Sequence, residues 1–215
     1  LVHASFNGVG GLSAIAKVIA GEISPSGKLP YTVPRHQGQL PIFHHQRSAS
    51  GYRSHTPFGN HYIDGPATPL FPFGFGLSYS DFALTDLQID KNAVAADGLV
   101  AISAKIENVG KVSAAEVVQL YIHSNTSGVT RPNQELKGFS RVELAPGESK
   151  RVTFTVSGRQ LGHTNAQGGF SVDPGVVDVY VGKSSSDRGL TGSFEITGAR
   201  LEMKSSERVF FSTVS

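Results

Sequence analysis

The sequence has no cysteine, no tryptophan and a single methionine among its 215 residues. The lack of cysteine excludes disulfide bonds, thiol catalysis and cysteine-ligated metals, but it leaves both a secreted and a cytoplasmic location open. No signal-peptide pattern is visible at the start. No apolar run approaches the roughly 20 residues of a membrane-spanning helix, so we expect no membrane partner. The chain opens at Leu1 rather than Met, and we expect it to be a fragment of a longer protein.

Charge of either sign is also scarce. Charged residues make up 17% of the chain, the net charge is +2, and the basic residues form no run. This pattern gives no electrostatic basis for binding nucleic acid. Hydrophobic residues at 39% are typical of a globular protein with one or two domains. The first 82 residues contain only three acids, Glu22, Asp64 and Asp81.

The stretch from Thr68 to Phe82 divides the chain into two parts of different texture. It holds four Phe and one Tyr, interleaved with two Pro and two Gly. Proline and glycine disfavour a regular helix, and large aromatic rings are usually buried. We predict a packed connector between two domains, in which the docking side chains are Phe71, Phe73, Phe75 and Tyr79.

The N-terminal part has the pattern of an α/β unit. Leu12, Ile15, Ala16 and Ile19 have helical spacing. A strand end is predicted at Leu1–Val2, and a proline-flanked edge strand at residues 28–34. The glycine-rich residues 8–11 match neither dinucleotide nor P-loop fingerprints, so a tight turn is favoured over a phosphate site.

Residues 36–67 carry five of the eight histidines in a long irregular segment. A metal site is one interpretation. No two of these histidines have helical ligand spacing, however, and solvated or hydrogen-bonded imidazoles are the favoured interpretation. We predict no metal and no cofactor.

After Phe82, apolar and polar residues alternate. Seven or eight short strands are predicted at regular spacing, with turn signals at residues 108–111, 145–148 and 173–175. The clearest alternations are Val100 to Ile106, Val118 to Ile122, Val152 to Val156 and Val177 to Val181. The predicted fold class is therefore mainly β. It is an antiparallel immunoglobulin-like β-sandwich of the fibronectin III kind, because the Cys…Trp…Cys core of antibody domains is absent.

Several runs, in order, resemble glycoside hydrolase family 3. SPSGKLP at residues 24–30 is similar to that family's PSGRLP. PLFPFGFGLSY at 69–79 is similar to PLfPFGhGLSYT, and AEVVQLY at 115–121 to GdEVVQLYV. TRP at 130–132 and ELKGF at 135–139 resemble tRPvkeLKGF. Together the runs span nearly the whole chain.

The resemblance implies an exo-acting β-glucosidase or β-xylosidase, usually built from a barrel, an α/β sandwich domain and a fibronectin III-like domain. Residues 1–35 would be the C-terminal remnant of the α/β domain, and 36–82 the His/Pro-rich loop and aromatic connector. Residues 83–198 would be the fibronectin III-like domain, and 199–215 a C-terminal tail that could add a strand. The partners would be the upstream barrel and α/β domains of the same enzyme and an oligosaccharide substrate.

The same resemblance implies that the catalytic residues are elsewhere. In the family the nucleophile is an Asp of the barrel, and the acid/base Glu lies earlier in the α/β domain. Retaining glycosidases need two carboxyl groups about 5–5.5 Å apart. None of the three early acids has an evident partner, and later acids are expected on exposed strand faces and turns. We therefore expect no catalytic residue in this chain.

The loop at residues 43–64 is expected to border the sugar site of the intact enzyme. Its substrate-edge candidates are His44, His45, Arg47, Tyr52 and Arg53, because His and Arg can hydrogen-bond hydroxyl groups and Tyr can stack on a ring. The alternative is that this loop only covers the domain seam. For the whole chain, the alternative is a free-standing carbohydrate-binding or adhesion β-sandwich module.

Overall fold

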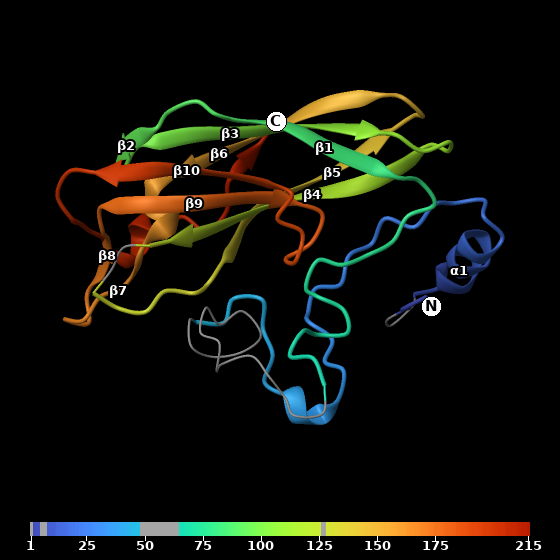
Figure 1. Cartoon of the computed structure of the whole chain (residues 1–215), viewed down its shortest axis with the longest axis horizontal. Coiled ribbons are helices and arrows are strands. Elements are labelled where there is room, and N and C mark those ends of the chain that lie inside the picture. The colour runs from blue at the N-terminus through green and yellow to red at the C-terminus, as the bar shows by residue number, and fades with distance from the viewer. Residues whose placement is uncertain (1, 5–7, 48–64, 126–127) are drawn as a thin grey trace.

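The computed structural model describes residues 2–4, 8–47, 65–125 and 128–215. Its main body is a sandwich of β-sheets, which occupies the upper part of Figure 1. Helix α1 (Gly11–Ile19) lies to one side of the sandwich. Two irregular segments run side by side below the sandwich toward the short 3-10 helix η1 (Gln37–Gln39) (Figure 1). The mainly β fold predicted from the sequence is confirmed.

The sandwich is built from two large sheets and a small one. The four-stranded sheet has the order β1 (Phe82–Ile89), β3 (Leu99–Asn108), β6 (Ser149–Ser157) and β12 (Thr213–Val214). The five-stranded sheet has the order β2 (Ala93–Ala95), β10 (Leu190–Thr197), β9 (Gly175–Gly182), β4 (Ala114–Ser124) and β5 (Glu135–Leu144). The small sheet contains β11 (Leu201–Glu202), β8 (Phe170–Val172) and β7 (His163–Thr164). All pairings are antiparallel except that of β2 with β10.

The apolar positions of the alternating strands meet between the two large sheets. On β3, Val100, Ile102, Ala104 and Ile106 are all at most 1% exposed. Between them, Ala101 and Lys105 are half-buried and Ser103 is 8% exposed. The inward residues of β4, β6 and β9 complete the core, with Phe154 fully buried at its centre. Burial of this apolar surface is the main source of stability of such a fold.

Helix α1 is confirmed, but its apolar stripe faces solvent. No residue of α1 is buried, and Leu12 and Ile19 are 80% and 70% exposed. The strands expected on either side of the helix differ from the prediction. Residues 2–4 form no strand, and residues 28–34 contribute only an isolated bridge between Val33 and Phe71. A strand needs neighbours to complete its backbone hydrogen bonds. In the described residues, the backbone hydrogen bonds of this segment go to the connector alone.

Several short elements were missed by the sequence patterns because they are too short to show a period. Among them are β2, β7, η1 and the 3-10 helix η3 (Gly158–Leu161). The 3-10 helix η4 (Ser205–Glu207) and the strands β11 and β12 lie within residues 199–215. In β12, Thr213 pairs with Thr155, and Val214 pairs with Phe154 of β6.

Candidate domain-docking and substrate-edge site

The aromatic connector is held to the segment before it by backbone hydrogen bonds. Leu29 N donates to Phe75 O (2.9 Å) and Gly74 N donates to Leu29 O (2.8 Å). Val33 N donates to Phe71 O (2.8 Å). The rings of Phe71 and Phe75 stack with their centroids 5.3 Å apart. These pairings explain why two stretches some 40 residues apart in sequence lie alongside each other in Figure 1.

The predicted docking residues differ in their surroundings. Phe71, Phe73 and Phe75 are all half-buried. Tyr79 is 51% exposed, and its hydroxyl donates to the carbonyl of Val18 in α1 (2.7 Å). The three Phe side chains are therefore partly shielded from solvent, whereas Tyr79 links the connector to helix α1 by a polar contact.

A buried polar pair on β4 holds the connector against the five-stranded sheet. Gln119 Nε2 donates to the carbonyls of Gly74 (3.1 Å) and Lys183 (2.8 Å), and Tyr121 OH donates to Gln119 Oε1 (2.5 Å). Gly74 has φ +77°, and a Cβ there would overlap the amide of Gln119. Only glycine meets both constraints without strain. The alternation of β4 predicts which face these side chains occupy but not what covers that face.

A buried ion pair joins the N-terminal segment to the sandwich. Lys28 Nζ lies 2.6 Å from Glu116 Oε1, and their side chains are only 11% and 6% exposed. Lys28 Nζ also donates to Gly76 O (2.9 Å), and Glu116 Oε1 accepts a hydrogen bond from Val117 N (2.6 Å). The prediction that acids after residue 82 lie on exposed faces and turns is wrong for Glu116. Its burial is tolerated because a lysine far away in sequence neutralises it.

The end of the connector is fixed by Asn108, which is fully buried. Asn108 Oδ1 accepts hydrogen bonds from the hydroxyl of Ser80 (2.6 Å) and from Gly110 N (3.0 Å). Its Nδ2 donates to the carbonyls of Val112 (2.8 Å) and Leu144 (3.0 Å). All four hydrogen bonds open to an asparagine side chain are thus made, and they connect the connector to the turns at one end of the sandwich.

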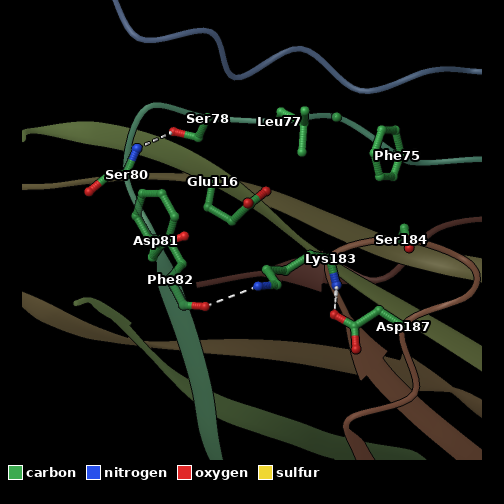
Figure 2. A pocket seen from close by; sticks show the side chains of 11 residues that line it. Phe75, Leu77, Ser78, Ser80, Asp81, Phe82, Glu116, Lys183, Ser184 and Asp187 are labelled. Carbon is green, nitrogen blue, oxygen red and sulfur yellow. Dashed lines mark hydrogen bonds between the residues drawn. The ribbon is translucent and has the colours of Figure 1, made fainter. Parts of the chain in front are cut away.

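A cavity of about 270 Å³ lies beside the ion pair, between the connector and the loop after β9 (Figure 2). Three carboxylates line it, those of Asp81, Glu116 and Asp187. Asp187 accepts hydrogen bonds from the backbone N–H groups of Lys183 (3.0 Å) and Gly189 (3.1 Å). Since Glu116 and Asp187 already serve these structural partners, we assign neither a role in glycoside hydrolysis.

A second, larger cleft has a volume of about 670 Å³. It is lined by residues 30–32, by residues 40–45 and by Phe73. Ile42 is buried, whereas Leu40 and Phe43 are 61% and 50% exposed. The cleft is therefore mostly apolar and open to solvent.

The predicted substrate-edge residues are only partly brought together. His44 is half-buried and stacks on Phe73, with ring centroids 4.0 Å apart. His45 is exposed and stacks on Phe43 at 5.5 Å. Arg47 is exposed and forms an isolated backbone bridge with Pro132. The other two candidates, Tyr52 and Arg53, lie outside the described residues.

A second charged network lies around the start of β5 and the small sheet. Glu135 lies 3.3 Å from both Arg131 Nη2 and Lys137 Nζ, whose side chains are 7% and 11% exposed. Burial lowers the pKa of both cations, and the charge of Glu135 opposes that shift. Nearby, His163 Nε2 is 3.4 Å from Asp173, and burial followed by the charge of Arg131 lowers the pKa of His163.

No group of three or more His, Cys, Asp or Glu residues is arranged to hold a metal ion within the ranges that the structure describes. In the same ranges, no helix is long and apolar enough to cross a membrane.

Two family models match different parts of the chain. The glycosyl hydrolase family 3 C-terminal domain matches residues 1–79, and the fibronectin type III-like domain matches residues 116–185. A periplasmic beta-glucosidase of Salmonella typhimurium is 38% identical over 194 residues, which cover 89% of this chain. A putative beta-xylosidase of Formosa agariphila is 42% identical over 177 residues, or 82% of this chain.

This chain belongs to glycoside hydrolase family 3.

Solved structures of the family agree with this assignment. A beta-glucosidase from Listeria innocua in complex with glucose has a TM-score of 0.78 and 32% identity, and the match covers 86% of this chain. The match covers 26% of that structure, and the two curated relatives are covered to 25% and 22%. The chain thus spans about a quarter of the length of these relatives and corresponds to their C-terminal part.

Proposed function

We propose that this chain is the non-catalytic C-terminal part of a β-glycosidase that removes terminal β-linked glucose or xylose from oligosaccharides. The observation that carries the proposal is the seam formed by residues 24–47 and 65–80 on the outer face of β4 and β9. A buried ion pair, the Gln119–Tyr121 pair and three half-buried Phe rings all lie in it. Such a seam would hold the remaining part of an α/β domain in a fixed orientation on the sandwich.

The partners of this unit would be the barrel and the rest of the α/β domain of the same enzyme. The solvent-facing apolar stripe of α1 supports the second of these partners, because Leu12 and Ile19 would otherwise stay in water. The substrate would be an oligosaccharide held mainly by those other domains.

We further propose that His44, His45, Arg47, Tyr52 and Arg53 border the sugar site in the longer enzyme. In support, the imidazole of His44 is held in place by Phe73, and His45 and Arg47 have exposed side chains. Contacts at the edge of a pocket mostly affect binding and substrate choice rather than the chemical step. Alanine at each position should then raise KM, or change the preference for longer oligosaccharides, with little change in kcat.

The two tyrosines on the central strands of the sandwich do not favour a free-standing carbohydrate-binding module. Such modules usually offer exposed aromatic rings in a row to stack on sugars. Here Tyr121 is 1% exposed, and the guanidinium of Arg188 lies 4.1 Å over the ring of the half-buried Tyr180.

The non-catalytic assignment is tested with the purified 215-residue chain and aryl β-glucosides and β-xylosides. We expect no release of the aryl group above that of a heat-inactivated sample, because neither carboxylate of the required pair is expected in this chain. Turnover that persists after repurification would refute the assignment.

A further inference from the structure

The apolar cleft of about 670 Å³ shares Phe73 with the docking region, and its other lining residues come from residues 30–32 and 40–45. Its size falls within the range of about 300–1,000 Å³ that is usual for small-molecule sites, and such sites are mostly apolar with a few placed polar groups. The rings of Tyr31 and Phe43 line it, although they are 45% and 50% exposed.

Neighbouring side chains hold these rings in place. The hydroxyl of Tyr31 is 2.8 Å from His3 Nε2, and the two rings meet edge to face. Phe43 stacks on His45 with an interplanar angle of 27°. Phe73, which also lines the cleft, is stacked on His44. Aromatic surfaces fixed in this way bind a planar ring with little further loss of side-chain entropy.

The cleft offers few polar groups for the number of hydroxyls on a sugar. Apart from the hydroxyl of Tyr31, which contacts His3, its side-chain polar atoms come from Thr32, His44 and His45. A pyranose carries a hydroxyl on most of its carbons, and each would lose water without gaining a partner here. Within the described residues, Thr32 Oγ1 is buried without a hydrogen-bond partner, although buried hydroxyls normally have one. These properties suit a flat apolar ligand with one or two oxygen atoms.

We propose that this cleft binds the aromatic aglycone of an aryl β-glycoside, that is, the leaving-group half and not the sugar. The proposal rests on the proposed function, because an aromatic ring is an aglycone only if the longer enzyme cleaves β-glycosides. The rings of Tyr31, Phe43, His44 and Phe73, which all line the cleft, would contact the bound ring.

The test is a titration of the whole 215-residue chain with 4-nitrophenol, followed by NMR of the aromatic and histidine ring signals. We expect saturable shifts of Tyr31, Phe43, His44 and His45, with a Kd on the order of 1 mM, as is usual for a ligand of about ten non-hydrogen atoms. Tyr31→Ala and Phe43→Ala should each weaken binding about five-fold through loss of ring stacking.

Phe139→Ala is the matched control. Phe139 is similarly exposed, at 55%, but lies on β5 outside the cleft, so its removal should leave the Kd unchanged. Shifts that do not saturate, or an equal loss of binding in Phe139→Ala, would overturn the proposal. It would also be overturned if D-glucose produced the same shifts at the same or lower concentration. The titration involves no turnover, so its failure is distinct from a failure of the hydrolysis test above.

Discussion

The buried Lys28–Glu116 pair gives the sharpest test of how the seam is held. In Lys28→Met, an apolar side chain of similar length replaces the ammonium and leaves the carboxylate of Glu116, 6% exposed, without its counter-charge. Removing one member of a buried pair typically costs about 3–5 kcal/mol. The seam can relieve this cost by opening and hydrating Glu116. The penalty should therefore appear first as local opening and not as global unfolding.

Amide hydrogen exchange measures that opening directly. Ser185 N, in the loop after β9, donates a hydrogen bond to the carbonyl of Phe73 across the seam (2.9 Å). A loss of about 3 kcal/mol would speed the exchange of this amide by roughly 150-fold. Amides in the centre of the sandwich, such as those of Ile102 and Phe154, should keep their wild-type rates because they do not depend on the seam.

Two further variants make the result decisive. In Lys28→Met/Glu116→Leu both charges are gone, so exchange should return close to the wild-type rate, since an apolar replacement of a buried pair is often neutral or better. Lys105→Met removes a cation from an exposed pair with Glu107, where both side chains are about 40% exposed, and should have no measurable effect. The reasoning is refuted if Lys28→Met leaves the exchange rate of the seam amide unchanged, or if this amide exchanges as fast in the double variant as in the single one.

Three other outcomes are expected. Ala in place of Phe71, Phe73 or Phe75 should weaken docking by about 1.5–3 kcal/mol, which is less than for fully buried rings because these rings are half-buried. Each variant should therefore be cleaved faster by proteases between residues 36 and 82, and unchanged cleavage in all three would contradict this. Burial lowers the pKa of His163 in the folded chain, so its contribution to the free energy of unfolding should be fully present above the ordinary histidine pKa of about 6.5 and should be lost as the pH falls through that value. In urea unfolding, His163→Gln should lack that part of the pH dependence. A piece with residues 80–215 should unfold cooperatively on heating and residues 1–40 should not, since the buried core lies wholly within the first; the reverse result would show that the division is misplaced.

The alternating strands were the part of the fold most open to prediction. The apolar positions from Val100 to Ile106 have a period of two and are all buried, because each strand of a two-layer sandwich has one face in the core. The spacing of Leu12, Ile15 and Ile19 predicted the helix correctly, although no residue of α1 is buried among the described residues.

The docking contacts could not be predicted in this way. Lys28 and Glu116 are 88 positions apart, and neither residue carries a local signal that the other neutralises it. Gln119 and Tyr121 lie on the face of their strand opposite Val118, Leu120 and Ile122, and the alternation does not predict what covers that face. They are buried because the connector lies over that face. The burial of polar residues at such a seam depends on which distant segments of the chain pair with each other. The periodicity of a single strand carries no information about that pairing.

The pairing of β12 with β6 has a practical consequence for handling the protein. Thr213 and Val214 occupy backbone groups of β6 that would otherwise form an open sheet edge, and Ser215 exchanges two further hydrogen bonds with Thr153. Such edges pair with strands of other molecules. A chain that lacks residues 213–215 would expose this edge, and we expect its soluble yield to be lower than that of the chain that keeps them.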